Sequence, residues 1–301
     1  MSTKFLRAAA LAVPLALLLS ACASGTNPGT GETSAAPAPA ETVRIGTVGA
    51  GDPYWKTFTD AAAAEGIDVE IVDFTEYPQP NPALSAGEID LNQFQHIIYL
   101  ATYNEAAGDD LQPIGSTAIY PLGLYSTQYA SVADIPAGST VAVPDDDSNQ
   151  ARGLLILQSA GLITLSDGGS IFSTLDQVDE ANSKVKVIAL DAAVTATSLP
   201  DVAAAIINND FVEDAGLTPG DAIAQDDPSD PKALPYVNIF ASRAADADNP
   251  TFLKLVEIYH STQAVLDGVL AASGGTAEIV KIPAADLVAS LDEVQGDIRA
   301  N

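Results

Sequence analysis

Short β-rich segments alternate with helical segments along most of this chain, and this alternation limits the fold more than any other feature. Strands are predicted from β-branched and apolar patterns over 43–48, 69–74, 88–91, 117–125, 140–144, 184–190, 203–207 and 236–242. Helices are predicted over 54–65, 81–87, 92–106 and 252–270. A strand–helix–strand order places parallel strands side by side beneath helices. The chain is therefore predicted to be an α/β protein with mostly parallel sheets flanked by helices.

The N-terminus has the features of a lipoprotein signal peptide. Lys4 and Arg7 precede an apolar stretch that is too short to span a bilayer comfortably. The stretch ends in Leu19-Ser20-Ala21-Cys22, where a cysteine directly follows a small-residue cleavage site. This order is typical of a lipobox, so residues 1–22 are predicted to be a signal peptide with lipid attached to Cys22. A conventional signal peptide with an incidental cysteine is the alternative.

Residues 23–41 are rich in Gly, Ser, Thr, Pro and Ala and contain no large apolar residue. Such a segment cannot bury enough apolar surface to order itself, and it is predicted to be a flexible linker. Residues 42–301 remain for folding, a length that suits either two lobes or one large domain. Cys22 is the only cysteine, which excludes an intrachain disulfide.

The chain is strongly acidic, with a formal net charge of −28. Such a surface argues against binding to nucleic acid and against docking on anionic lipid. The runs Asp145–Asp147 and Asp226–Asp227 lack the alternating spacing and closing Glu of a calcium loop, so solvated loops and no metal site are predicted there.

Catalytic motifs are missing from the sequence. There is no Gly-x-Ser-x-Gly elbow, no phosphate loop and no His-x-x-x-His pair. His260 lies in an amphipathic helical pattern and is predicted to be a surface residue. We therefore expect neither an enzyme nor a cofactor, while a surface hydrolase that uses two carboxylates stays an alternative.

The residues that follow the predicted strands are rich in aromatic and amide side chains. Parallel sheets place ligand sites beyond the carboxyl ends of their strands, which directs attention to 49–55, 77–81, 92–99, 145–152, Asn208 and Asn238. On a helix that begins at Asn92, His96 and Tyr99 would share one face, with Phe94 in the first turn. Aromatic residues at this spacing can serve a binding site or simply the core.

Arg152 is the basic residue of most interest. Ser148-Asn149 is predicted to cap a helix, which would place Arg152 in or just beyond the first turn, where the helix dipole disfavours a cation. An ion pair with Asp145–Asp147 would account for a cation at this position. So would a functional role in which Arg152 clamps the carboxylate of a ligand in bidentate geometry.

Six ordered sequence blocks resemble the NlpA family of methionine-binding lipoproteins, over roughly 43–260. The blocks are 73–81 (DFTEYPQPN), 87–96 (GEIDLNQFQH), 121–126 (PLGLYS), 148–152 (SNQAR), 205–208 (AIIN) and 235–238 (PYVN). The resemblance implies a two-lobed periplasmic-binding-protein fold with its ligand in the interlobe cleft. By position, it implies the ligand-binding residues Tyr77, Phe94, His96, Tyr99, Arg152, Asn208 and Asn238.

Crossovers between the lobes are predicted at the strand-like segments near 121–125 and 236–241. This assigns residues 42–123 and 240–301 to lobe 1 and residues 124–239 to lobe 2. The family's glycine-proline-histidine after the first strand and its proline before the helix tyrosine are replaced here by 51–55 and Ile98, both expected near the cleft. Residues 274–301 resemble nothing in the family.

The implied function is capture of L-methionine, or a close derivative, for the permease and ATPase of an ABC importer. The protein would be a monomer anchored by lipid to the extracytoplasmic face of the cell membrane. Another apolar amino acid, D-methionine or a methionyl dipeptide is the alternative ligand. A surface hydrolase or an adhesin is the alternative class.

Overall fold

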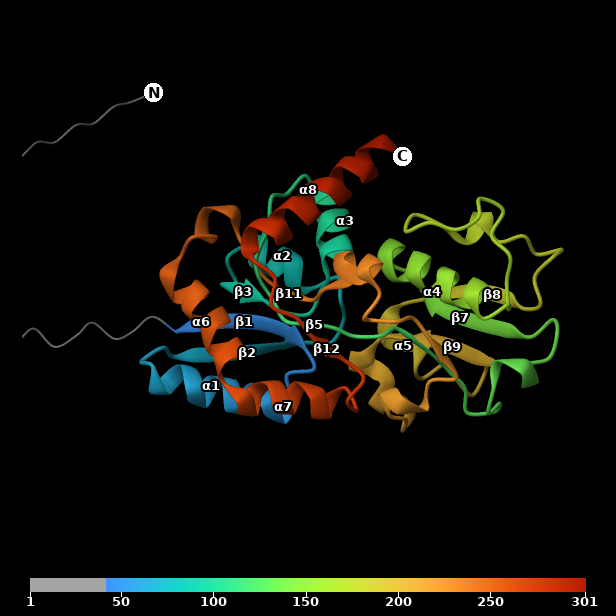
Figure 1. Cartoon of the computed structure of the whole chain (residues 1–301), viewed down its shortest axis with the longest axis horizontal. Coiled ribbons are helices and arrows are strands. Elements are labelled where there is room, and N and C mark those ends of the chain that lie inside the picture. Colours follow the sequence, from blue (N-terminus) through green and yellow to red (C-terminus); the bar gives the residue numbers. More distant parts are fainter. Residues whose placement is uncertain (1–41) are drawn as a thin grey trace, which may run out of the picture. The chain divides into compact units, whose positions relative to one another are not determined.

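The computed structural model describes residues 42–301, which lie within one compact unit. The predicted signal peptide 1–22, its lipidated Cys22 and the linker 23–41 lie outside the described residues. Two five-stranded sheets, each covered by helices, make up most of the unit (Figure 1).

The first sheet combines strands from the beginning of the described chain with one strand from much later. Its order is β2 (Val69–Phe74), β1 (Val43–Val48), β3 (Leu91–Asn92), β11 (Ile239–Ser242) and β4 (Gln112–Ser116). Strand β1 pairs in parallel with β2 and β3, whereas β11 is antiparallel to both of its neighbours. Every strand except β11 therefore runs in the same direction.

The second sheet repeats this arrangement. Its order is β8 (Lys186–Leu190), β7 (Thr140–Pro144), β9 (Ala204–Ile207), β6 (Gly123–Tyr125) and β10 (Ala224–Gln225). Strand β7 is parallel to β8 and β9, whereas β6 is antiparallel to β9 and β10. In both sheets the antiparallel strand is the first that the chain forms after crossing from the other sheet. The prediction of mostly parallel sheets flanked by helices is confirmed.

Helices cover both faces of the first sheet and build two cores. One core contains side chains from α1 (Pro53–Ala64), α6 (Pro250–Ser261) and α7 (Gln263–Ala272). The other contains side chains from α2 (Pro80–Ser85), α3 (Ile97–Ala107) and α8 (Ala284–Ala300). Figure 1 shows α1 and α7 on the opposite side of β1 from α2, α3 and α8.

Side chains of the second sheet alternate between two cores, one on each face of the sheet. Val141, Val143 and Ile206 join the core of α4 (Asp147–Ser159) on one face. Ala205 and Ile207 join α5 (Ala192–Thr195) and the 3₁₀ helix η3 (Asn209–Ala215) on the other. The remaining 3₁₀ helices are η1 (Val132–Asp134), η2 (Leu175–Gln177), η4 (Pro219–Asp221), η5 (Pro231–Tyr236) and η6 (Ala244–Asp246).

Several predicted boundaries are wrong. The helix predicted from Asn92 begins only at Ile97, because 93–96 are hydrogen-bonded to the sheet: Gln93 donates its backbone N–H to Gly46 and Ile239 donates to Gln95. The predicted strand 88–91 overlaps the two-residue strand β3 only at Leu91.

Two further segments are divided, and a third is shorter than predicted. The predicted strand 117–125 is split between β5 (Ala118–Ile119) and β6 where the chain crosses between sheets, and Pro121 there has no N–H to donate. The strand predicted over 236–242 begins at Ile239, after η5. The predicted helix 252–270 is broken at Thr262, whose backbone is extended.

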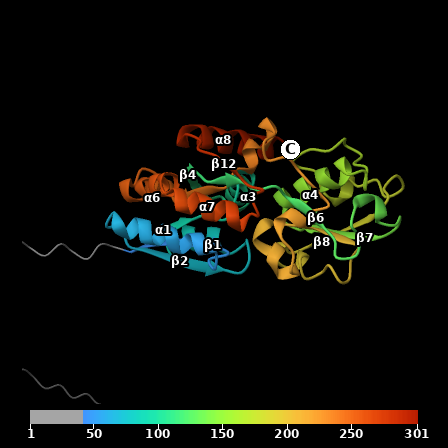
Figure 2. The ribbon, with the colours of Figure 1, turned by 60° about the horizontal axis from the view of Figure 1, so that its bottom comes forward.

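Residues 274–301 pack around the first sheet. Strand β12 (Glu278–Ile279) pairs antiparallel with β5, and α8 packs against α3 and β4 (Figure 2). His260 is half-buried rather than a surface residue, because its Nε2 donates to the carbonyl oxygen of Ser116 at 2.8 Å. Burial lowers the pKa of His260.

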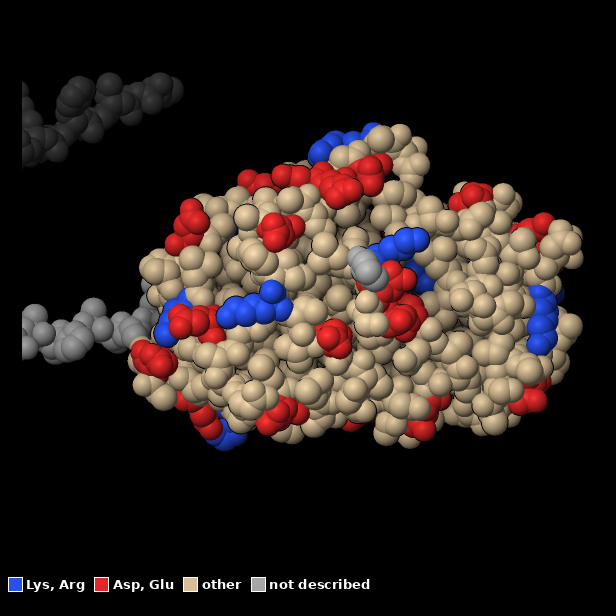
Figure 3. All heavy atoms as spheres, in the orientation of Figure 1, with Lys and Arg blue, Asp and Glu red and all other residues tan. Residues whose placement is uncertain are grey.

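Acidic side chains are spread over the face drawn in Figure 3 and do not gather in one patch. Within residues 42–301, none of the helices combines the length and apolar character needed to cross a membrane. The division into lobe 1 (42–123 and 240–301) and lobe 2 (124–239) stays a prediction.

Candidate ligand-binding pocket

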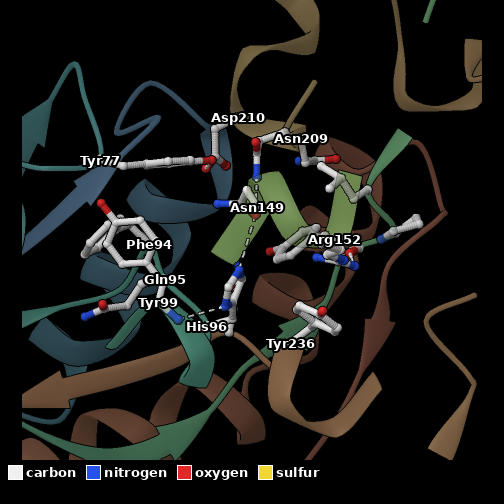
Figure 4. Close-up of a pocket in the computed structure, with 15 residues that line it drawn as sticks. Tyr77, Phe94, Gln95, His96, Tyr99, Asn149, Arg152, Asn209, Asp210 and Tyr236 are labelled. Atoms are coloured by element: carbon white, nitrogen blue, oxygen red, sulfur yellow. Dashed lines mark hydrogen bonds between the residues drawn. The ribbon is translucent and has the colours of Figure 1, made fainter. Parts of the chain in front are cut away.

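One pocket lies where segments following the strands of both sheets meet (Figure 4). All of the residues predicted to bind a ligand line it: Tyr77, Phe94, His96, Tyr99, Arg152, Asn208 and Asn238. The structure adds residues that the sequence did not assign to binding: Gln95, Tyr120, Pro121, Leu122, Asn149, Asn209, Asp210 and Tyr236. The pocket occupies the edge at which parallel strands end, as expected for an α/β protein.

Residues 51–55 and Ile98, which differ from the family and were expected near the cleft, do not line this pocket. Tyr54 and Trp55 are buried in the core beneath α1, and Ile98 is buried against the core of α3. Tyr54 and Trp55 therefore stabilise the first sheet, and neither lines the pocket.

Three aromatic rings form one wall of the pocket. The ring centroid of Tyr77 lies 5.8 Å from that of Phe94 and 6.1 Å from that of Tyr99, and Phe94 and Tyr99 are 5.7 Å apart. Tyr77 and Phe94 are each 6% exposed and also pack in the core that contains β9. The rings therefore serve the core and the pocket at once.

His96 has a defined tautomer. It is the N-cap of α3, and its Nδ1 accepts a hydrogen bond from the backbone N–H of Tyr99 at 3.2 Å. Nε2 must then carry the proton, which it donates to Oδ1 of Asn149 at 3.3 Å. Burial, with a contribution from nearby Arg152, lowers the pKa of His96 to about 3. The imidazole is therefore a neutral donor at physiological pH.

The expectation that His96 and Tyr99 share a helix face is wrong, because His96 precedes the helix. Its ring instead meets that of Tyr99 edge to face, with centroids 6.3 Å apart. Phe94 likewise lies before the helix, at a bend of the chain, and lines the pocket.

Asn149 connects several of the polar groups. Its Oδ1 accepts from His96 and, at 3.1 Å, from Nδ2 of Asn208, while its own Nδ2 donates to both carboxylate oxygens of Asp146 at 3.0 Å. His96 follows a strand of the first sheet and Asn149 a strand of the second. Asn238 pairs with His96 through a backbone bridge. This network joins the two sides of the pocket.

Arg152 is held by groups other than those predicted. The N-cap of α4 is Asp146 rather than Ser148 or Asn149, so Arg152 lies beyond the first turn. Nε donates to Oδ2 of Asp226 at 2.6 Å, and a terminal nitrogen donates to the carbonyl oxygen of Tyr120 at 2.8 Å. The guanidinium carbon lies 4.3 Å from the ring centroid of Tyr236. The alternative explanation, an ion pair with Asp145–Asp147, is wrong, because the ion-pair partner of Arg152 is Asp226.

Asp226 is correspondingly not a fully solvated loop residue. Its side chain is 26% exposed, and its Oδ1 accepts from the backbone N–H of Leu122. Arginine carries five N–H donors, and Asp226 and Tyr120 account for only part of them. Arg152 itself is 5% exposed and lines the pocket, so it can offer further donors to an anion there.

Two polar atoms of the pocket are buried without a hydrogen-bond partner among residues 42–301: Oδ1 of Asn208 and the hydroxyl of Tyr236. Buried polar atoms are nearly always paired, because leaving one unpaired costs about 1–3 kcal/mol. Their position indicates that a polar ligand completes this site.

Asp210 contributes the only carboxylate among the residues that line the pocket. Its Oδ2 accepts from the hydroxyl of Tyr77 at 2.7 Å, from across the pocket. Desolvation within the pocket raises the pKa of Asp210 to about 7, and the negative charge of Asp52 adds to the effect. Asp210 as a whole is nevertheless exposed to solvent, so it lies at the pocket's open edge, and only the part of its side chain beside Tyr77 is desolvated. In the sequence, its position two residues after Asn208 was the signal that could have indicated a role for Asp210 in binding.

Within residues 42–301, no group of three or more His, Cys, Asp or Glu side chains is arranged to hold a metal ion. The pocket instead offers an aromatic wall, a neutral imidazole, amides, one guanidinium and one carboxylate. These groups suit a small molecule that has both an apolar part and charged polar atoms.

Comparison with known proteins gives consistent matches. A family model described as NlpA lipoprotein matches residues 43–272. The D-methionine-binding lipoprotein MetQ of Yersinia pestis is 36% identical over 268 residues, which cover 87% of this chain and 94% of that protein. The MetQ of Escherichia coli K12 is 40% identical over 201 residues, or 66% of this chain and 73% of that protein.

Solved structures of similar proteins have the same fold. The substrate-binding protein of a methionine transporter from Streptococcus pneumoniae superimposes with a TM-score of 0.74 at 35% identity, covering 79% of this chain and 95% of that one. A nutrient-binding protein from Burkholderia cenocepacia, solved bound to methionine, superimposes with a TM-score of 0.72 at 35% identity, covering 79% and 99%.

Proposed function

The chain belongs to the NlpA lipoprotein family, and we propose that it captures L-methionine, or a close derivative, and delivers it to the permease and ATPase of an ABC importer. In this proposal the protein is a solute-binding monomer and not an enzyme. Its lipid-anchored N-terminus holds it at the extracytoplasmic face of the cell membrane.

The observation that carries the proposal is the pairing of an aromatic wall with a guanidinium in one pocket. Tyr77, Phe94 and Tyr99 suit a thioether, since sulfur makes favourable contacts with aromatic rings. The remaining N–H donors of Arg152 suit the ligand's carboxylate. The unpartnered Oδ1 of Asn208 and hydroxyl of Tyr236 suit the polar end of an amino acid.

Alternative ligands within the same class are another apolar amino acid, D-methionine and a methionyl dipeptide. D-Methionine is favoured as the second candidate by the names of the relatives. A surface hydrolase and an adhesin are the alternative classes, and the pocket's residues favour neither.

Thermal unfolding with a panel of amino acids tests the ligand. L-Methionine at ~1,000 times its dissociation constant should raise the free energy of unfolding by about 4 kcal/mol, provided that it binds only the folded state. A larger stabilisation by an acidic, basic or small polar amino acid would contradict the role given to the aromatic wall. A response to none of them would favour the adhesin or hydrolase.

Replacement of Cys22 tests the anchor. The Cys22→Ser variant lacks the thiol to which lipid is attached, so it should move from the membrane fraction to the soluble fraction without detergent. Its melting temperature should not change, because the change removes only the site of lipid attachment and none of the contacts described within residues 42–301. Ser20→Thr, which leaves the thiol in place, serves as the control. A Cys22→Ser protein that stays with the membrane would refute the anchor.

A further inference from the structure

Of the two charged residues that line the pocket, one has an oppositely charged partner and the other does not. Arg152 has a carboxylate, Asp226, at 2.6 Å. Asp210 has the neutral hydroxyl of Tyr77, and within residues 42–301 no basic side chain forms an ion pair with it. The pocket therefore contains one charge that is already balanced and one that is not.

The surroundings of Asp210 penalise its negative charge. Desolvation and the nearby carboxylate of Asp52 raise the pKa of Asp210 to about 7, although the hydrogen bond from Tyr77 acts in the opposite direction. A cation beside the carboxylate would reverse this penalty, because an opposite charge at close range favours the ionised form. The cation would have to come from outside the described chain.

The carboxylate also has room for a second partner. Tyr77 donates to Oδ2 only, and an ionised carboxylate accepts hydrogen bonds at both oxygens. Asn208, whose Oδ1 is buried without a partner among residues 42–301, lies at the start of the same 3₁₀ helix. Side-chain oxygens from both residues thus line the pocket with capacity to accept further hydrogen bonds.

We propose that Asp210 accepts the α-ammonium group of the bound amino acid and thereby makes a free, charged amine a requirement for tight binding. The proposal rests on the proposed function, because it needs an amino acid in this pocket. Arg152 then meets the carboxylate and Asp210 the ammonium, so that both charges of the zwitterion are recognised by charged side chains.

The test compares an amino acid with the same molecule lacking its amine. Calorimetric titration measures the dissociation constants of L-methionine and 4-(methylthio)butanoate for the wild type and for Asp210→Asn. Asparagine keeps the size of the side chain and can still accept from Tyr77, but it has no charge. The preference for L-methionine over the desamino acid should fall at least about tenfold in Asp210→Asn.

Three more variants show whether the charge of Asp210, and not its hydrogen bond or the net charge of the protein, sets the preference. Asp145→Asn removes an equal charge from an exposed residue outside the pocket and should leave the preference unchanged within about twofold. Tyr77→Phe removes the hydrogen bond to Asp210 without a charge, and it should weaken both ligands alike. Asp210→Ser removes the charge with a different side chain and should reproduce the loss of preference.

Each outcome supports or overturns the proposal. An unchanged preference in Asp210→Asn and Asp210→Ser, or equal weakening of both ligands, overturns the proposal and leaves the proposed function intact. If another amino acid binds in place of methionine, the same comparison with its desamino acid decides the role of Asp210. If no amino acid binds the wild type, the proposed function and this proposal fail together.

Discussion

Replacing Arg152 with alanine should lower the affinity for L-methionine at least ~30-fold, the equivalent of about 2 kcal/mol. The guanidinium is 5% exposed and lines the pocket, so its loss leaves the ligand's carboxylate without a charged partner. Arg152→Lys should recover little, because an ammonium cannot supply the planar fork that contacts Asp226 and the ligand together.

Titration calorimetry of both variants measures the loss, and melting of the ligand-free proteins measures any damage to the fold. Arg243→Ala is the matched control, because Arg243 is also ion-paired, with Asp246 at 2.7 Å, and lies outside the pocket. It should lower stability without changing affinity. An affinity of Arg152→Ala within about threefold of the wild type would mean that Arg152 only holds Asp226 in place.

The parts of the fold that depend on local patterns could be predicted. Strands β1, β2 and β7 have the predicted limits, since each is a continuous β-rich run with Gly or Asp next to one of its ends. The resemblance to the NlpA family, and with it the fold of substrate-binding proteins, is confirmed by the family model and by the solved structures.

The helix starts were misplaced for a physical reason. Asn92 and Ser148 are good N-cap residue types, but a cap also requires backbone N–H groups that are free of the sheet. Gln93 donates to Gly46 in β1, so the helix cannot begin before His96. Asp146, which lies nearer to β7 than Ser148, accepts from the N–H of Asn149 and begins α4 first. The starts of α3 and α4 therefore depend on hydrogen bonds that the residue types alone do not reveal.

The part of the site that was not predicted depends on contacts between distant segments. Arg152 and Asp226 are 74 residues apart, Tyr77 and Asp210 are 133 apart, and His96 and Asn149 are 53 apart. Rules about strand ends locate each residue separately but do not reveal which of them meet. Pairing of Arg152 with Asp145–Asp147, its nearest acidic neighbours in the sequence, was therefore the ion pair that the sequence suggested, and Asp210 was not predicted at all.

Residues 274–301 had no assignable role in the sequence, yet α8 is built into the first sheet's core. Leu287, Leu291 and Val294 are buried in the same core as Ile97 and Leu100 of α3, and they recur at helical spacing on one face of α8. In Figure 2, α8 runs over this side of the unit, and the strand β12 that precedes it pairs with β5 near the crossing between sheets. The segment therefore stabilises the first sheet at the point where the chain leaves it.

Leu291→Ala should accordingly lower the free energy of unfolding by about 2–5 kcal/mol, because the side chain is 0% exposed and its removal opens a cavity beneath α8. Affinity for L-methionine should stay within about twofold of the wild type once the variant is folded, since Leu291 does not line the pocket. Chemical denaturation with and without ligand measures both quantities. The same substitution at Leu253, which is 40% exposed on α6, should change stability by no more than about 0.5 kcal/mol. If Leu291→Ala costs no more than Leu253→Ala, α8 does not stabilise the fold, and a role for residues 274–301 must be sought on the outer surface of the helix.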